Sequence, residues 1–360
     1  MNNNEIRIGV IGVGAIGPSH IYAINRTKGA KLAAICDIRP EAATKLAEEN
    51  GVPYFSSVDE MLKADVVDAV TLCTPSGFHL DTALQVIDAG KHLLVEKPLE
   101  ITTERIDQII AAGRKQGVKV GCVFQLRTTP FMRQLKEMID GGLIGEVFSG
   151  SAYTKMYRDQ GYYDSSNWRG TWKVDGGGCL MNQGIHIADL FIWFMGDVES
   201  VIGIAETKGR NVEIETLALG LVSFKSGAKG VIESTTLAYP ELPRYLEIFG
   251  SRGTVAFSPS KLMRLDLIDP TPEEIQWKEE TIAKQAVTEA AEAEAKKNVK
   301  PGTAVAQTDM GHTPTIQDFV DAIRFDREPF VNGEEARKPV DFITAIYRSG
   351  QNGSQPIKLG

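Results

Sequence analysis

Short apolar runs alternate with helix-like segments through the first third of the chain. The runs lie at residues 6–11, 32–36, 66–73, 92–95 and 118–124, and helical periodicity fills residues 16–24, 41–50, 78–89 and 102–116. Strands that are apolar throughout and alternate with helices are typical of a parallel sheet covered on both faces. Because such crossovers are right-handed, residues 1–124 are predicted to form a doubly wound α/β domain.

The pattern changes after Phe124. Helical periodicity at residues 129–139 and 184–194 is followed by strand-like segments at residues 201–207, 216–224, 228–237, 245–250 and 254–257. Tight turns such as Lys225-Ser226-Gly227 join neighbouring strands in antiparallel fashion. Residues 125–360 are therefore predicted to form an α+β domain with a large, mostly antiparallel sheet and helices on one face. Residues 279–297, rich in Ala, Glu and Lys, indicate a solvated helix or a mobile insertion, and two helices at residues 316–324 and 334–349 end the chain.

Composition narrows the class of protein. Hydrophobic residues make up 42% of the 360 and charged residues 24%, the net charge is −8, and no apolar run reaches membrane-spanning length. The negative charge argues against nucleic-acid binding, and the N-terminus does not resemble a signal peptide. The histidines lack metal-ligand spacing, so no metal site is expected. Four widely spaced cysteines indicate reduced core thiols in a cytoplasmic protein: Cys36, Cys73, Cys122 and Cys179.

A glycine-rich turn follows the first predicted strand and opens the first helix. Its sequence is Gly12-Val13-Gly14-Ala15-Ile16-Gly17. In the dinucleotide-binding Rossmann arrangement, the first glycine permits the tight turn, the second lets the backbone approach a pyrophosphate, and the third lets helix and strand pack closely. The helix N-terminus adds free N–H groups and the positive end of its dipole. We therefore predict a Rossmann domain whose turn, with Ala15 and Ile16, binds a nicotinamide dinucleotide.

An acidic residue at the end of the second strand indicates which dinucleotide binds. Asp37 lies 20 residues after Gly17, where a carboxylate can bind the ribose hydroxyls and repel a 2′-phosphate. Asp37 therefore favours NAD. Arg39 keeps NADP open, because an arginine there can pair with a 2′-phosphate. A Rossmann-like domain that has lost its cofactor is the main alternative.

Residues 89–99, with the sequence AGKHLLVEKPL, carry a family resemblance. They resemble the A-G-K-H-V-x-x-E-K-P signature of the glucose–fructose oxidoreductase / inositol dehydrogenase / rhizopine-catabolism (Gfo/Idh/MocA) family, and the resemblance extends over nearly the whole chain. It implies a Rossmann domain followed by an open, mostly antiparallel sheet through which dimers or tetramers form. It also implies NAD(P)-dependent oxidation of CH–OH groups. The cofactor-binding residues that it implies beyond the glycine turn are Thr74, Pro75, His79, Glu96 and Lys97.

The resemblance assigns the central chemistry to Lys97, which would reach the substrate oxygen beside the nicotinamide. Oxidising an alcohol builds negative charge on that oxygen, and a preorganised ammonium stabilises the charge. Without the resemblance, an ion pair between Lys97 and Glu96 would be the simpler interpretation. The peptide bond before Pro98 is a candidate for the cis form, which would aim the lysine.

A second set of site residues lies in the segment Gly176 to Asp189. Many sugar and inositol dehydrogenases of the family have an Asp and a His four residues apart, the His acting as general base. This chain has His186 but carries Asn182 in place of the Asp. An i, i+4 pair shares one helical face, so both side chains can meet the substrate. The change leaves open whether His186 or Lys97 accepts the proton. Asp189 is expected to pair structurally.

The segment between residues 153 and 173 combines aromatic and basic side chains. Aromatic faces stack on sugars, and arginines bind carboxylate or phosphate. The expected substrate-binding residues are therefore Arg158, Tyr163, Trp168, Arg169 and Trp172, together with Lys97, Asn182 and His186. Packing against the sheet is the alternative for this segment. By resemblance, the substrate is a small sugar-like molecule, with a nucleotide-linked or uronate sugar favoured.

Three other functions stay open at this point. The first is an inositol, polyol or glucoside dehydrogenase. The second is a redox-neutral lyase or hydrolase that uses bound NAD for transient oxidation. The third is a non-catalytic dinucleotide sensor, which the retained Lys97 and His186 argue against.

Overall fold

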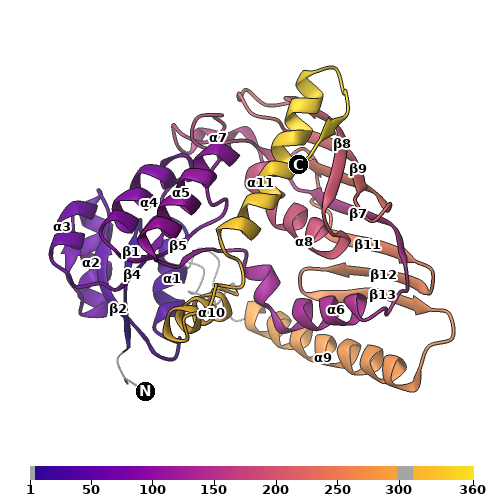
Figure 1. Ribbon diagram of the computed structural model, residues 1–360, viewed down its shortest axis with the longest axis horizontal. Helices are drawn as coiled ribbons and strands as arrows, with labels where there is room; N and C mark the ends of the chain where they lie inside the picture. Colours follow the sequence, from indigo (N-terminus) through magenta and orange to yellow (C-terminus); the bar gives the residue numbers. More distant parts are fainter. Residues whose placement is uncertain (1–4, 298–310) are drawn as a thin grey trace.

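The computed structural model describes residues 5–297 and 311–360. Two β-sheets lie side by side, one in the N-terminal part of the chain and one in the C-terminal part (Figure 1). Among the described residues, no helix combines the length and the apolar character that crossing a bilayer requires.

The N-terminal sheet has six strands in the order β3-β2-β1-β4-β5-β6, and every pairing is parallel. The strands are β1 (Ile6–Ile11), β2 (Ala30–Cys36), β3 (Tyr54–Phe55), β4 (Ala69–Leu72), β5 (His92–Val95) and β6 (Val120–Cys122). The helices are α1 (Gly17–Ile24), α2 (Pro40–Asn50), α3 (Val58–Lys63), α4 (His79–Asp88) and α5 (Thr103–Gln116), with a short 3₁₀ turn, η1 (Ser76–Phe78). All residues of β4 are buried, as strands covered on both faces require. The predicted doubly wound fold is confirmed.

The C-terminal sheet has eight strands in the order β13-β12-β11-β7-β10-β9-β8-β14. Only β7 and β10 pair in parallel; the other pairings are antiparallel. The strands are β7 (Val147–Lys155), β8 (Val198–Glu206), β9 (Leu217–Phe224), β10 (Lys229–Thr235), β11 (Tyr245–Gly250), β12 (Gly253–Ser258), β13 (Lys261–Leu267) and β14 (Ile357–Lys358). The predicted mostly antiparallel sheet is confirmed, but the pattern along the chain did not indicate β7, β13 or β14.

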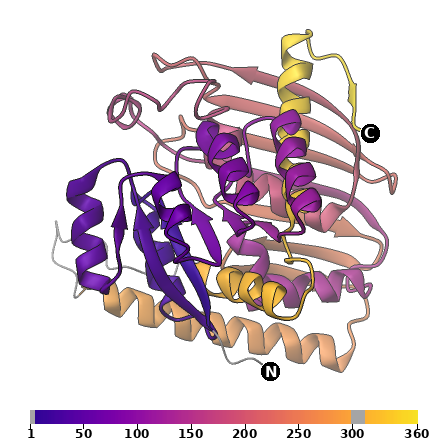
Figure 2. The same cartoon turned by 60° about the vertical axis from the view of Figure 1, so that its left-hand side comes forward.

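Helices cover one face of this sheet (Figures 1 and 2). They include α8 (Ile185–Met195), which packs on β7, and α11 (Gly333–Gln351), which packs on β8 and also contacts α5. The other helices of this part are α6 (Pro130–Asp140), α7 (Gln160–Asp164), α9 (Pro272–Lys297) and α10 (His312–Arg324), with a 3₁₀ turn η2 (Gln125–Thr128) and a π-helical turn η3 (Cys179–Gln183). The expected helix over residues 279–297 is thus the larger part of α9.

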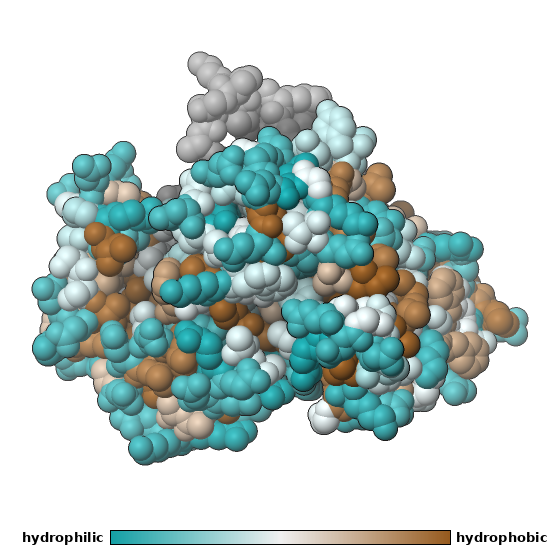
Figure 3. Space-filling view, turned by 90° about the horizontal axis from the view of Figure 1, so that it is seen from above, coloured by the Kyte–Doolittle hydropathy of each residue, from teal (hydrophilic) through white to brown (hydrophobic). Residues whose placement is uncertain are grey.

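The opposite face of the sheet carries exposed apolar side chains. Ile202 pairs with Leu221 and Leu221 pairs with Val231, so these residues form a row across β8, β9 and β10. Their exposed fractions are 38%, 57% and 38%. Seen from above, hydrophobic side chains emerge in separate groups between hydrophilic ones, some of them on the side of the C-terminal sheet (Figure 3).

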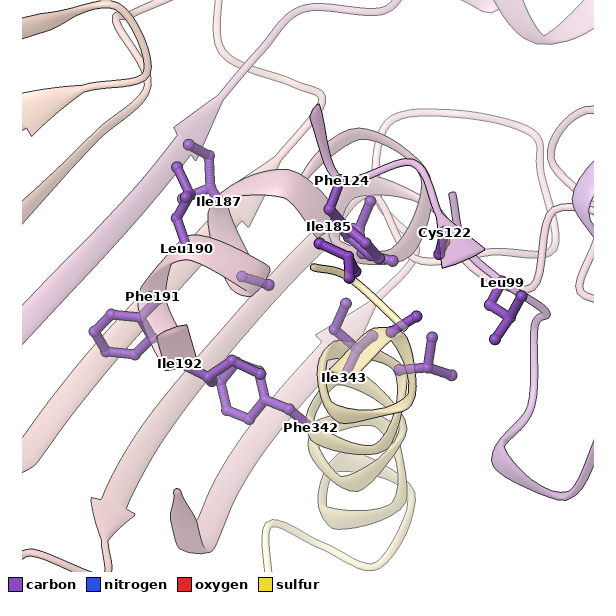
Figure 4. Close-up of a cluster of buried hydrophobic side chains, with 14 of the residues drawn as sticks. Leu99, Cys122, Phe124, Ile185, Ile187, Leu190, Phe191, Ile192, Phe342 and Ile343 are labelled. Carbon is purple, nitrogen blue, oxygen red and sulfur yellow. The ribbon is translucent and has the colours of Figure 1, made fainter. Parts of the chain in front are cut away.

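One hydrophobic core runs through both parts of the molecule. Leu99, Cys122 and Phe124 lie beside α8 and α11 in the same buried cluster as Ile185 and Phe342 (Figure 4). Helix α10 comes late in the chain but packs on α1 and contributes to a second buried cluster, formed with residues of β1, α1 and β2. The division of the chain at residue 124 stays a prediction.

Candidate active site

The glycine turn connects β1 to α1 as the fingerprint predicts. Gly12 has φ +89°, and a Cβ there would lie 2.9 Å from the carbonyl group of Cys73. A Cβ on Gly17 would lie 2.4 Å from the Gly12 carbonyl oxygen. At Gly14, by contrast, the nearest atom to a Cβ would be an Arg39 nitrogen at 3.6 Å. The fold therefore requires Gly12 and Gly17, whereas the protein itself would tolerate a Cβ at Gly14, which agrees with a role of Gly14 in letting a pyrophosphate approach the backbone.

Asp37 follows β2 and faces this turn. Its Oδ2 accepts the N–H of Val13 at 2.8 Å and its Oδ1 accepts the N–H of Arg39 at 2.8 Å. The Arg39 guanidinium bonds both oxygens at 3.2 Å. Burial opposes ionisation of Asp37, but the hydrogen bonds from Arg39 and Val13 outweigh it and lower the pKa of the carboxyl group. An ionised carboxylate at this place is the acceptor that ribose hydroxyls require.

Thr74 and Pro75 follow β4, at the same edge of the sheet as the glycine turn. The Thr74 hydroxyl is buried and has no hydrogen-bond partner among the described residues. Buried polar atoms are normally bonded, so this hydroxyl is available to a ligand at this edge of the sheet. The space at Gly14, the N-terminus of α1, the Asp37 carboxylate and this hydroxyl fit a dinucleotide.

His79 and Glu96, both expected to bind the cofactor, have side chains that bond other parts of the protein. His79 is buried, with Nε2 at 2.8 Å from the Thr74 carbonyl oxygen and Nδ1 at 3.0 Å from the Pro98 carbonyl oxygen. Burial lowers the pKa of His79. The Glu96 carboxylate bonds His20, His312 and the backbone of Lys97. Both side chains therefore hold the loop that carries Lys97, and their contact with the cofactor stays a prediction.

Lys97 lies two residues after the end of β5 and is joined to Pro98 by a cis peptide bond. Its Nζ donates to the backbone oxygen of Asn182 at 2.9 Å rather than forming an ion pair with Glu96. Desolvation lowers the pKa of Lys97, while the negative charges of Glu96 and Asp175 act in the opposite direction. The ammonium is thus aimed at the C-terminal domain.

Asn182 lies in the π-helical turn η3, whereas His186 lies in the first turn of α8. The two residues do not share one regular helix, because Gly184 separates the π turn from α8. That part of the spacing argument is wrong. Lys97 nevertheless lies near both, because it bonds Asn182 and its charge acts on His186.

The His186 imidazole is partly buried and neutral. Desolvation, with the Lys97 charge second, lowers its pKa to about 3. Its Nδ1 is buried without a hydrogen-bond partner among the described residues. The ring packs edge-on against Phe124 with centroids 6.0 Å apart. A neutral imidazole with an unbonded nitrogen can accept a proton.

Sequence patterns did not indicate the role of Asp175. Its Oδ1 accepts the Asn182 side-chain amide at 2.6 Å, and its Oδ2 accepts the N–H of Gly170 at 2.6 Å. Asp175 is 3% exposed, and burial raises its pKa. The chain therefore carries a carboxylate beside Asn182, seven residues earlier than the position where the family pattern has one.

The predicted substrate-binding residues separate into two groups. Arg158 reaches the Gln183 side chain at 3.2 Å, and Arg169 bonds the Tyr162 hydroxyl at 2.6 Å, which in turn bonds Gln183 at 3.0 Å. Gln183 also bonds Asn182 at 3.1 Å, so both arginines are connected to the site. Tyr163, in contrast, is buried and bonds Thr236.

The two tryptophans lie at the edge of this network. Trp168 stacks under the Arg169 guanidinium at 4.7 Å. Trp172 is 38% exposed and packs edge-on against Tyr347 at 5.3 Å between centroids. The interpretation of the whole segment as pocket lining is therefore too broad, and Tyr163 serves packing, which was the alternative.

Arg244 is a cation that the sequence patterns did not reveal. It precedes β11, makes no hydrogen bond or ion pair with the described residues, and its charge acts on both Lys97 and His186. Desolvation lowers its pKa, Glu241 opposes that effect and Arg158 adds to it. No spacing motif surrounds it, so only the fold brings it to Lys97.

Comparison with known proteins agrees with this geometry. A family model described as an oxidoreductase family with an NAD-binding Rossmann fold matches residues 6–124, and the model of the GFO/IDH/MocA C-terminal domain matches residues 132–256. Fold and comparisons together define an NAD-dependent oxidoreductase with a Rossmann sheet and a second, mostly antiparallel sheet. The chain belongs to the GFO/IDH/MocA family of oxidoreductases, as the sequence resemblance predicted.

Three relatives illustrate the range of the family. Myo-inositol 2-dehydrogenase of Thermotoga maritima is 29% identical over 259 residues, 69% of this chain and 74% of that enzyme. D-glucoside 3-dehydrogenase of Escherichia coli is 29% identical over 199 residues, 54% of this chain and 56% of that enzyme. The crystal structure of the WlbA dehydrogenase from Bordetella pertussis, in complex with NADH and UDP-GlcNAcA, is 31% identical with a TM-score of 0.89, and the match covers 100% of this chain and 99% of that one.

Proposed function

We propose that this enzyme oxidises a ring hydroxyl of an anionic sugar derivative, with a nucleotide-linked uronate as the favoured substrate. The observation that carries the proposal is the convergence of Lys97 and neutral His186 near two arginines, Arg158 and Arg244. The WlbA relative supports it, because that structure contains a UDP-linked sugar acid with NADH.

Each residue has a defined task in this proposal. Bound NAD supplies the carbon that accepts the hydride. The Lys97 ammonium donates a hydrogen bond to the substrate oxygen and stabilises the charge that develops there. The neutral imidazole of His186 accepts the hydroxyl proton, and the alcohol becomes a carbonyl. The backbone oxygen of Asn182 accepts from Lys97, and Asp175 holds Asn182 in place through its side-chain amide.

Charge explains why an anionic substrate suits this site. An imidazole with a pKa of about 3 is a weak base. Desolvation is the main cause of that low value, and the cations Lys97 and Arg244 add to it. A carboxylate or diphosphate near Arg158 and Arg244 would offset these charges and raise the pKa of His186. Substrate binding would thereby create the base that oxidation requires, whereas a neutral inositol would not.

Substrate screening tests the proposal. NADH formation is measured with UDP-linked uronates, UDP-linked neutral sugars, myo-inositol and glucosides. We expect the uronates to have the highest kcat/KM, and Lys97→Ala to reduce kcat about 100- to 1,000-fold with NADH affinity unchanged. Faster turnover of inositol or glucosides contradicts the substrate proposal. Redox-neutral conversion without NADH release would indicate a lyase or hydrolase, and NADH binding without any turnover would indicate a sensor.

The arginine pair has its own test. We expect the double variant Arg158→Ala/Arg244→Ala to raise KM for an anionic sugar by at least about tenfold, because a charge-assisted hydrogen bond contributes about 1.5–3 kcal/mol. Arg264→Ala, which removes a surface arginine of β13 paired with Asp266, is the matched control and should leave KM unchanged. An equal loss for neutral and anionic sugars would argue against charge recognition.

We also propose a homodimer or homotetramer in the cytoplasm. The apolar row Ile202, Leu221 and Val231 on the open sheet face is the surface expected to join two copies. Leu221→Lys should reduce the mass measured by light scattering. Phe325→Lys, which changes an exposed apolar residue after α10, should not. The four buried free cysteines agree with a reducing compartment.

The NAD preference is tested by comparing kcat/KM for NAD and NADP. The Asp37 carboxylate bonded to Val13 supports NAD. NADP stays an alternative, because turning Arg39 outward would place its guanidinium beside a 2′-phosphate.

A further inference from the structure

A buried carboxylate lies between two imidazoles directly behind Lys97. Glu96 Oε1 is 2.8 Å from His20 Nε2 and 3.2 Å from His312 Nε2. Glu96 Oε2 accepts the backbone N–H of Lys97 at 3.0 Å. The exposed fractions are 8% for Glu96, 0% for His20 and 1% for His312. The cluster joins the end of β5 to α1 and α10, three segments far apart in the sequence.

The contacts define the charge of this cluster. His20 Nδ1 lies 2.7 Å from the Thr71 hydroxyl, and burial lowers the pKa of His20. A neutral His20 accepts from Thr71 and donates its Nε2–H to Glu96. Burial of Glu96 opposes ionisation, but hydrogen bonds from His20 and His312 outweigh it and hold its pKa well below the usual value. Glu96 is therefore the anion of this cluster.

A bound metal ion explains this arrangement less well. The three ligand atoms lie within 4.8 Å of one another, so a divalent cation has the beginning of a coordination sphere. Zinc, however, takes four ligands, and the described residues bring only these three together. A dication would also place positive charge beside Lys97. Hydrogen bonding accounts for all the short contacts without an ion.

We propose that Glu96 is a positioning residue, held as an anion by His20 and His312, which stabilises the ammonium form of Lys97 and fixes its backbone beside the substrate. The proposal rests on the proposed catalytic role of Lys97. Two features carry it: the carboxylate is buried next to Lys97 in the chain, and both of its oxygens accept hydrogen bonds, Oε1 from His20 and His312 and Oε2 from the Lys97 N–H.

The other charged or titratable groups near Lys97 do not replace Glu96. They come from the elements packed around the lysine: Asp175, Cys122, His186 and Arg244. Arg244 disfavours the ammonium form and His186 is neutral. Burial raises the pKa of both Asp175 and Cys122, so these groups ionise less readily than usual. Glu96 is thus the main anion for Lys97.

Chemical labelling measures the Lys97 pKa without any substrate. The purified full chain is treated with a limiting small amine-reactive anhydride over a series of pH values, and labelling of Lys97 is quantified by mass spectrometry. In Glu96→Gln we expect the labelling midpoint to fall by about one pH unit or more, because a neighbouring opposite charge shifts a pKa by about 1–3 units. The alkaline limb of kcat should fall by the same amount.

Glu100→Gln is the matched control. Glu100 is also fully buried, lies in the same loop and pairs with Arg105, but it is not among the main charges that act on Lys97. It should leave the Lys97 midpoint where it is. If Glu96→Gln does not fold, His312→Asn weakens the cluster and should move the midpoint in the same direction by a smaller amount.

Three outcomes decide the proposal. A Lys97 midpoint that stays constant in every folded variant of Glu96 and His312 overturns it. A stoichiometric metal in the purified protein that is lost in His312→Asn also overturns it and identifies a metal site. A midpoint that falls in Glu96→Gln supports it, even if the wild-type enzyme oxidises no sugar, in which case only the proposed function fails.

Discussion

Gly14→Ala should separate cofactor binding from folding. A Cβ at Gly14 would meet only an Arg39 nitrogen at 3.6 Å, which is ordinary van der Waals contact. Replacing glycine where the conformation is compatible stabilises the folded chain by about 0.4–1 kcal/mol. The same Cβ projects into the space proposed for the pyrophosphate. A phosphate oxygen bonds a backbone N–H at about 2.9 Å, whereas a methyl carbon keeps oxygen at about 3.5 Å.

The expected loss of affinity follows from that difference. Losing one charge-assisted hydrogen bond costs about 1.5–3 kcal/mol, which corresponds to a 10- to 100-fold higher Kd for NADH. Calorimetric titration gives Kd and thermal unfolding gives stability. Gly17→Ala is the contrasting variant, because its Cβ would lie 2.4 Å from the Gly12 carbonyl oxygen and should prevent stable folding. Gly161→Ala, whose nearest contact is at 3.5 Å on Asp159, should raise stability by an amount similar to that of Gly14→Ala and leave NADH affinity unchanged. Wild-type NADH affinity in a folded Gly14→Ala would refute the proposed position of the pyrophosphate.

Three further predictions concern the C-terminal domain. Arg127→Met should lower the free energy of unfolding in urea by about 3–5 kcal/mol. The change leaves the fully buried Asp189 without its bidentate partner, whose hydrogen bonds measure 2.6 and 2.9 Å, and unchanged stability would contradict this. Titration of His186 should leave kcat/KM constant from pH 8 to pH 5, because its neutral form persists until the pH approaches its pKa of about 3. A loss of kcat/KM on the acid side with a midpoint near pH 6.5 would contradict this pKa. Asp175→Asn should lower kcat about 10- to 100-fold through misplacement of Lys97 while NADH affinity holds, and a change in NADH affinity alone would argue against this role.

The Rossmann half was predictable because its signals are local. Strands such as residues 69–72 are apolar throughout, and the glycine turn follows the first strand directly. The two-residue strand β3 is too short to give a pattern. In the C-terminal half, hairpins predicted neighbouring antiparallel strands, but nothing local places β7 between β10 and β11 or makes it parallel to β10. The aromatic and basic residues at its end resembled a site segment and concealed the strand.

The site also contains residues that local motifs indicate and residues that only the fold brings together. Lys97, Asn182 and His186 were predicted from local motifs, and the fold brings them together. A structural pairing of Asp189 was expected, but the sequence did not indicate that Arg127 is its partner. His20 and His312 stand 292 positions apart in the sequence, and only the packing of α10 on α1 brings both to Glu96. Long-range pairs of this kind leave no spacing in the chain.

The positions of the carboxylates suggest how the departure at Asn182 is tolerated. A carboxylate at residue 182 would lie at the backbone that Lys97 bonds, and it would raise the pKa of His186 directly. In this chain the nearest carboxylates act on the site less directly. Asp175 accepts from the Asn182 amide, and Glu96 accepts from the backbone N–H of Lys97. Both favour the lysine cation, and neither bonds His186. The free enzyme is therefore prepared to stabilise an alkoxide, whereas its His186 is only a weak base, and the negative charge of an anionic substrate would strengthen that base. Substrate charge and base strength would then be coupled, so that neutral sugars bind without being oxidised efficiently.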